Sequence, residues 1–408
     1  MPTRCTLSAV LLLAAWPLVA GEITEKNLRF AEYPDFPDAH STWGSIGYSA
    51  KHKKVFVGVT NHRDREGIVE YDVRTGEIRL RGFIDQLANL RDYQWQGKVH
   101  TKLAEGPDGA MYFATDGGES REEYLMDHPH GYGGGFFFRW DPATNQLTNL
   151  GMGLQYDSIK DVEVDQVDGK IYAVSYPQVR FLVYDFQKND LRDLGRMGSD
   201  HVPRILFRDW WSNAYYVDWR QRLIKYERDG GKLVFARDSL PAFPGTPGER
   251  IITGITAYAI DQPNGIIYLA TYGSKMVAFY PQKTGIGRWE DLGGLYDDPG
   301  KPPYDYYVPN LALGRNGKLY YFLGGHGMYA GGEPNVTLME FDPKQRTKRV
   351  VLRFPLHVIT EVTGCDVKDE SGTMYFAGRR DDRRARRMGE SGASRPFLLM
   401  FNPEKEIR

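Results

Sequence analysis

The sequence GKVHTKLAEGPDGAMYFATDGG, residues Gly97–Gly118, is the pattern from which the fold can be predicted, because variants of it recur along the chain. It begins with an alternating run in which His100 and Lys102 share one face of an expected strand. A tight turn follows at Gly106–Gly109, where proline fixes φ and glycine accepts a positive φ. A second strand, Ala110–Thr115, then returns antiparallel. The stretch predicts a β-hairpin that carries a histidine and a lysine beside an open loop.

Counterparts of the second strand recur at intervals of 43 to 60 residues, each centred on an aromatic residue: Phe56, Tyr112, Tyr172, Tyr215, Tyr268, Tyr320 and Tyr375. Most are followed by a third strand that ends in an aromatic-Asp pair, and often by a fourth strand. Such a pattern is typical of a β-propeller, whereas a twin sandwich would not have this regular spacing. We therefore expect an all-β, seven-bladed β-propeller of four-stranded antiparallel blades. The last repeat stops at its third strand, Phe397–Phe401, so the N-terminal strand Leu28–Tyr33 is expected to close the ring.

The first 20 residues have the pattern of a secretory signal peptide. Arg4 precedes an apolar core, Leu7–Trp16, that is too short to span a bilayer, and Ala20 suits the cleavage site. We therefore expect residues 1–20 to be removed and residues 21–408 to form a single propeller domain. The location would be secreted or periplasmic, with no membrane span after cleavage. The mature chain would keep only Cys365, so an internal disulfide is excluded.

The composition limits the class of partner. A formal net charge of −1 gives no support for nucleic-acid binding. With 45 Gly and 23 Pro, the chain favours many short strands and turns over long helices. We expect a monomer.

Insertions relative to the repeat gather at one edge of the predicted ring. They are Gly118–Gly135, the segment that contains His326, and Arg379–Arg395, with a further long connection at Gly293–Tyr307. Long loops at one rim are where propellers place ligand sites.

His100 is the first candidate for chemistry. Its ring would point into the channel near Lys102, and a second histidine, His128 or His130, would approach from the rim loop. Two histidines beside a cation suit proton transfer or neutralisation of an anionic substrate. The alternative is a channel-lining histidine that bonds a backbone carbonyl.

Other candidates occupy equivalent rim positions and the starts of inner strands. The rim positions hold Tyr176, Arg220, Tyr272, His326 and Arg379, and Lys160 and Arg204 begin inner strands. A phenol, an imidazole and a guanidinium around one opening can bind a uronate carboxylate and move its α-proton. Packing of the tyrosines, and pairing of the cations with Asp161, Glu163 or Glu361, are the plain alternatives. His128-Pro129-His130 is an HxH pattern, but no third metal ligand can be assigned.

Several of these segments resemble secreted seven-bladed propeller polysaccharide lyases, notably ulvan lyases, and more distantly oligogalacturonate lyases. They are Gly97–Lys102, Asp108–Thr115, the region from His130 to Pro142, and Ile171–Pro177. The resemblance implies cleavage of a uronate polymer by β-elimination. It implies His100, His130, Tyr176 and Arg204 as catalytic residues, with Tyr272 as a further candidate. The rim and inner-strand positions give the substrate-binding candidates Lys102, Lys160, Arg220, Tyr272, His326 and Arg379. Some members hold a metal ion, so a divalent metal is a possible cofactor whose ligands cannot be assigned.

Three functions remain open at this point. The first is a lyase acting on an anionic polysaccharide or oligosaccharide that contains uronic acid. The second is a non-catalytic propeller that binds a glycan or a protein. The third is a metal-dependent hydrolase or lactonase on the same fold, and the fold alone cannot separate the three. Convergence of His100, His130, Tyr176 and Arg204 in one pocket would favour the lyase.

Overall fold

The computed structural model describes residues 22–37, 39–61, 65–117, 131–198, 205–218, 220–241, 254–272, 274–297, 308–323, 335–381 and 394–407. The predicted signal peptide lies outside these ranges. Helical structure within them is short, consisting of α1 (Ile84–Leu87) and the 3-10 turns η1 (Glu25–Asn27), η2 (Asp92–Gln94) and η3 (Gln262–Asn264). In the described residues, no helix combines the length and apolar character needed to cross a membrane.

The strands of the described residues form six hydrogen-bonded sheets. Four have four strands each: β2 (Ile46–Ser49), β3 (Lys54–Thr60), β4 (Glu66–Asp72) and β5 (Ile78–Phe83); β11 (Ser158–Val164), β12 (Ile171–Tyr176), β13 (Arg180–Asp185) and β14 (Asp190–Arg196); β15 (Phe207–Arg208), β16 (Ala214–Val217), β17 (Arg222–Glu227) and β18 (Lys232–Ser239); β19 (Ile255–Asp261), β20 (Ile266–Thr271), β21 (Lys275–Pro281) and β22 (Gly287–Gly294). A fifth contains β6 (Lys98–Val99), β7 (Ala104–Glu105), β8 (Met111–Asp116), β9 (Phe136–Asp141) and β10 (Gln146–Met152).

The largest sheet has eight strands and holds both ends of the described chain. One half contains β23 (Asn310–Leu313), β24 (Leu319–Leu323), β25 (Asn335–Asp342) and β26 (Thr347–Pro355), and the other contains β27 (Glu361–Cys365), β28 (Met374–Asp381), β29 (Ser394–Phe401) and β1 (Leu28–Glu32). A short parallel contact between β23 and β27 joins the halves, and β1 pairs antiparallel with β29, Leu28 lying opposite Phe401. The N-terminal segment thus supplies the outer strand beside the C-terminal one.

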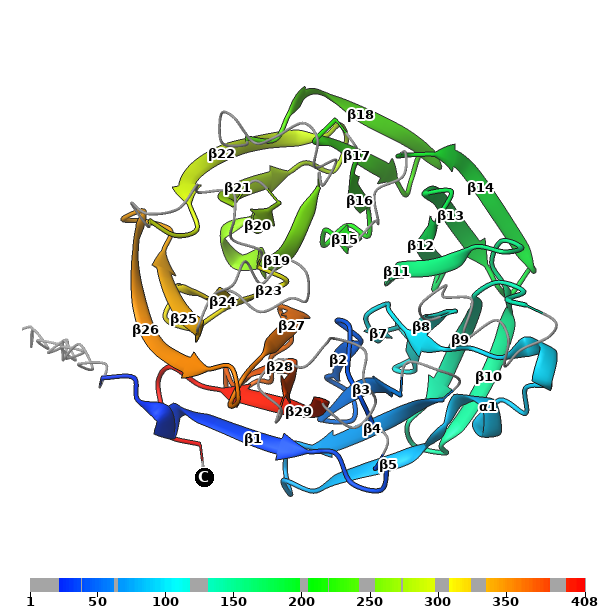
Figure 1. The fold of residues 1–408 in the computed structure, drawn as a ribbon. Helices are drawn as coiled ribbons and strands as arrows, with labels where there is room; N and C mark the ends of the chain where they lie inside the picture. The colour runs from blue at the N-terminus through cyan, green and yellow to red at the C-terminus, as the bar shows by residue number, and fades with distance from the viewer. Residues whose placement is uncertain are drawn as a thin grey trace, which may run out of the picture.

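The sheets are arranged radially around a central space (Figure 1). Strands such as β2, β11 and β19 lie nearest the centre, whereas β5, β14, β22 and β1 lie at the periphery (Figure 1). The aromatic residues that mark the sequence repeat all lie in β3, β8, β12, β16, β20, β24 and β28, the strands next to the inner ones. The fold is a β-propeller, as the spacing of the repeats predicts.

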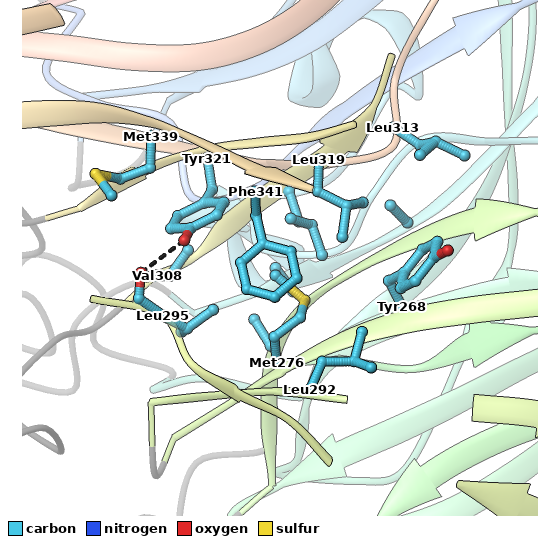
Figure 2. Close-up of a cluster of buried hydrophobic side chains, with 14 of the residues drawn as sticks. Tyr268, Met276, Leu292, Leu295, Val308, Leu313, Leu319, Tyr321, Met339 and Phe341 are labelled. Atoms are coloured by element: carbon cyan, nitrogen blue, oxygen red, sulfur yellow. Dashed lines mark hydrogen bonds between the residues drawn. The ribbon is translucent and has the colours of Figure 1, made fainter. Parts of the chain in front are cut away.

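Apolar side chains fill the spaces between neighbouring sheets. Figure 2 shows one such cluster, in which Met276 of β21 and Phe341 of β25 meet between two sheets. Both side chains are buried. The Tyr321 hydroxyl in this cluster donates a hydrogen bond to the Leu295 carbonyl at 2.6 Å (Figure 2). Burial of large apolar surfaces between sheets makes each blade dependent on its neighbours.

The inner strand of the hairpin at Gly97–Gly118 is not continuous, which corrects the sequence prediction. β6 and β7 both pair with β8, but residues 100–103 between them leave the ladder. The Thr101 hydroxyl accepts a hydrogen bond from the Ala114 amide at 3.0 Å and so takes the place of a backbone carbonyl. His100 and Lys102 still line the same central cavity, although not as alternate residues of one regular strand.

Candidate functional site

The candidate site lies at the end of the central channel where the inner strands begin. His100 leaves the ladder directly after β6, is 7% exposed, and places its Nδ1 3.0 Å from the carbonyl oxygen of Lys160. Because a carbonyl oxygen only accepts, the proton of the neutral ring is on Nδ1. Nε2 then carries the lone pair, which is the state that a general base needs.

Lys160 links His100 to the neighbouring blade. It is the extra residue of a β-bulge in β11, since Ile159 lies opposite Ser175 and Asp161 lies opposite Val174. Bulges redirect side chains and are common beside active sites. The Lys160 ammonium forms an ion pair with Asp116, at the end of β8, and Ser158 donates a hydrogen bond to the same carboxylate at 3.0 Å. Despite its burial, Asp116 has a pKa well below its usual value, because the Lys160 ammonium and then Lys98 favour the charged form.

Tyr176 completes this cluster at the end of β12. Its half-buried ring lies against Lys160, with the ammonium 5.2 Å from the ring centroid. Lys160 therefore contacts His100 through its carbonyl, and contacts Asp116 and Tyr176 through its ammonium. Two residues predicted to be catalytic, His100 and Tyr176, are brought together by one lysine.

The channel below this cluster is a cavity of about 350 Å³ whose lining includes His100 and Lys102. The Lys102 ammonium lies 3.0 Å from Asp161 and 2.9 Å from Glu163, and it also donates to the Leu206 carbonyl. Burial alone would lower the pKa of Lys102, but the Asp161 and Glu163 carboxylates hold it well above its usual value. Three acceptors use the three donors of this ammonium, so Lys102 joins strands across the channel in this arrangement.

Arg379 lies at the same rim and is 4% exposed. Its Nε donates to Glu361 at 2.6 Å, and its guanidinium lies 5.9 Å from the centre of the Trp43 ring. Lys98 of β6 lies over the same ring at 5.3 Å. The half-buried Trp43 lines the cavity and thus stands between two cations at its mouth.

The remaining predicted residues are distributed differently. Arg220 is exposed in the connection between β16 and β17, and Tyr272 is half-buried directly after β20. The lining of the cavity includes neither of them, and it does not include Lys160, Tyr176 or Arg379 either. His130, Arg204 and His326 lie outside the described residues, as does His128, so their predicted roles stay predictions.

Sequence reasoning missed Lys98, Trp43 and the contact between Asp116 and Lys160. Lys98 could have been found, because Lys98, His100 and Lys102 form an i, i+2, i+4 series on one face of the expected strand. Trp43 precedes the first repeat and carries no pattern of its own. The ion pair of Asp116 joins two blades, and spacing within one hairpin cannot predict it.

Glu66 is a further buried carboxyl beside this rim. It is 2% exposed and lies opposite Thr60, which itself bridges to Ser41. Neither of its carboxyl oxygens accepts a hydrogen bond from any residue that the structure describes. Burial raises the pKa of Glu66 well above its usual value, and the nearby Val99 amide and Lys98 ammonium oppose this shift without cancelling it. The surroundings of Glu66 therefore favour the neutral form over the charged one.

We expect Glu66→Gln to remove a pH dependence of stability. The pKa of Glu66 is higher in the folded chain than in the unfolded chain. At a pH between these two pKa values, the folded state therefore binds more protons than the unfolded state. The stability of the wild type should therefore fall as pH rises through this window, whereas glutamine does not titrate. Thermal denaturation should show a Tm advantage of the variant that grows by several degrees between pH 5 and pH 8. A Tm difference independent of pH would contradict an elevated pKa.

No group of three or more His, Cys, Asp or Glu side chains in the described residues could hold a metal ion. The HxH pattern at His128 and His130 lies outside them.

The sequence matches no known family model and no curated protein. Solved structures share its fold. Selenomethionine-substituted virginiamycin B lyase from Staphylococcus aureus is similar with a TM-score of 0.57 and 10% identity, covering 92% of this chain and 99% of that one. The WD40 repeats of RRP9 are similar with a TM-score of 0.53 and 14% identity, covering 91% of this chain and 97% of that one. U3-55K is similar with a TM-score of 0.55 and 13% identity, covering 92% of this chain and 98% of that one. At these identities the likeness concerns the β-propeller fold alone.

Proposed function

We propose that this protein is a lyase that cleaves an anionic, uronic-acid-containing polysaccharide by β-elimination. The observation that carries the proposal is the contact of Lys160 with both His100, which lines the channel, and Tyr176. An imidazole that can take a proton and a phenol that can give one are thereby held beside a rim rich in cations.

The proposed chemistry requires three functions from the site. A base removes the proton at C5 of the uronate, which is acidic because the adjacent carboxylate can accept the developing charge. An acid then protonates the leaving oxygen at C4 as the C4–O bond breaks and the C4–C5 double bond forms. His100 Nε2 is suited to the first role and the Tyr176 hydroxyl to the second, while cations at the rim stabilise the enolate-like intermediate.

The likeness of fold to a protein named a lyase is compatible with this proposal, and the likeness to WD40 repeats is compatible with the alternative of a non-catalytic binding propeller. We further propose a seven-bladed ring closed by β1 on β29, and secretion or periplasmic location after removal of residues 1–20. The pairing of β1 with β29 and the apolar N-terminal pattern support these two proposals.

A screen of uronate polymers tests the lyase directly. Ulvan, polygalacturonate and glucuronan would each be incubated with the protein, and the absorbance of the unsaturated product would be followed. We expect product from at least one polymer and none from a neutral glucan, because the C5 proton is acidic only beside a carboxyl group. Binding of these polymers without any product would reject the lyase and favour the binding propeller.

A further inference from the structure

Lys98 is a buried cation that forms no ion pair with the residues that the structure describes. Lys98 is 7% exposed and lies opposite Asp116 in the ladder of β6 and β8. Within the described part of the chain, its ammonium donates no hydrogen bond and forms no ion pair, and its contact is with the Trp43 ring.

Two carboxylates near Lys98 each contact another cation. Asp116 forms an ion pair with Lys160, and Glu361 forms one with Arg379. Burial raises the pKa of a third nearby carboxyl, Glu66. Among the described residues, Lys98 forms no ion pair with any of these three carboxyl groups. A buried ammonium without a partner is costly, so such a site favours an anionic ligand.

The surroundings indicate what kind of anion fits. Trp43 lines the cavity and lies against Lys98, and an indole face or edge is a usual surface for the apolar side of a ring. His100 follows Lys98 by two residues in the chain, and its Nδ1 contacts the carbonyl oxygen of Lys160 in the neighbouring sheet. An acidic group attached to a small polar ring would satisfy both the ammonium and the indole.

We infer that Lys98 and Trp43 form a subsite that binds the acid group of an acidic sugar. The inference rests on the proposed function for its choice of sugar and deepens it, since it names the residue that would carry the charge of the substrate. A carboxylate and a sulfate ester share the required negative charge, and the experiment separates them. Lys98 is a positioning residue in this role and takes no proton from the substrate.

Binding of monosaccharides tests the subsite without any need for cleavage. We would titrate the wild type and Lys98→Met with D-glucuronate, D-glucose 6-sulfate and D-glucose, following ligand NMR signals and thermal shift. Loss of a charge-assisted hydrogen bond should weaken binding of the preferred acidic sugar by about 10- to 100-fold in the variant. Glucose should bind much more weakly than the acidic sugars, and the stronger of glucuronate and the sulfate identifies the acid group.

Lys54→Met is the control, because Lys54 is a half-buried lysine of β3 that is paired with Glu70 and Asp72. It should bind the acidic sugar as the wild type does and should have a lower Tm. Lys98→Met should instead have an equal or higher Tm, since it removes a lone buried charge. Lys98→Gln provides a second variant that keeps a polar side chain.

The outcomes separate this inference from the lyase proposal. Unchanged binding of acidic sugars in both Lys98 variants, or no preference of the wild type for acidic sugars over glucose, would overturn the subsite. Acidic-sugar binding that depends on Lys98, in a protein that yields no unsaturated product from any polymer, would support the subsite and reject the lyase.

Discussion

Replacement of His100 by alanine is expected to lower the rate of uronate-polymer elimination by about two to four orders of magnitude, the range for a positioned acid–base group. The fold should survive, but the Lys160 carbonyl loses its partner at 3.0 Å, which should cost about 1–3 kcal/mol of stability. The measurement is a rate on the responsive polymer together with a Tm on the same sample.

His100→Asn separates catalysis from structure. Its side-chain amide can donate to the Lys160 carbonyl but cannot take a proton at pH 7, so we expect a Tm near that of the wild type with a rate as low as that of the alanine variant. His357→Ala, at an exposed turn, should change neither quantity. A destabilised His100→Ala protein that stays proportionately active would remove His100 from the catalytic assignment and favour the binding propeller.

Asp161→Ala should cause the largest loss of stability, about 3–5 kcal/mol, because it breaks a buried ion pair by removing one partner. The Asp161 carboxylate accepts from the Lys102 ammonium at 3.0 Å and from the Leu206 amide at 2.8 Å, so it joins three neighbouring blades. Loss of the Asp161 carboxylate leaves the buried Lys102 ammonium with less negative charge around it and the buried Leu206 amide without its acceptor.

Denaturant unfolding would measure this effect, with Asp193→Ala as the control. Asp193 pairs with Arg180, but both side chains are about one-third exposed, so its removal should cost at most about 1 kcal/mol. Equal losses in the two variants would show that the channel ion pairs do not tie the blades together.

The repeat could be predicted from the sequence because it is a local property. Tyr172, Tyr215 and Tyr375 recur in part because each hydroxyl donates to an aspartate that follows the preceding strand, namely Asp165, Asp209 and Asp369. Both partners lie within one hairpin, so the spacing is visible in the chain. The break at residues 100–103 was not predictable in the same way, because the Thr101 side chain competes with the backbone for the Ala114 amide.

The candidate site could be predicted only in part for a related reason. His100, Lys160 and Tyr176 were identified from their positions at the starts and ends of strands, and the structure places them together. Their geometry depends on a bulge at Lys160 and on an ion pair with Asp116 of another blade, and neither leaves a signal in spacing. The raised pKa of Glu66 depends on the surrounding burial, which the sequence does not specify at a single position.

The pairing of β1 with β29 has a consequence for the handling of the protein. β29 contains the apolar run Phe397–Phe401, all of it buried, and Phe30 of β1 packs edge-on against Phe397 at 5.2 Å. A proteolytic cut beyond Leu28 would uncover this run as an open sheet edge with unused amides and carbonyls. Such an edge recruits strands from other molecules. Removal of the N-terminal residues beyond Leu28 should therefore promote aggregation, although no side chain at the channel is changed.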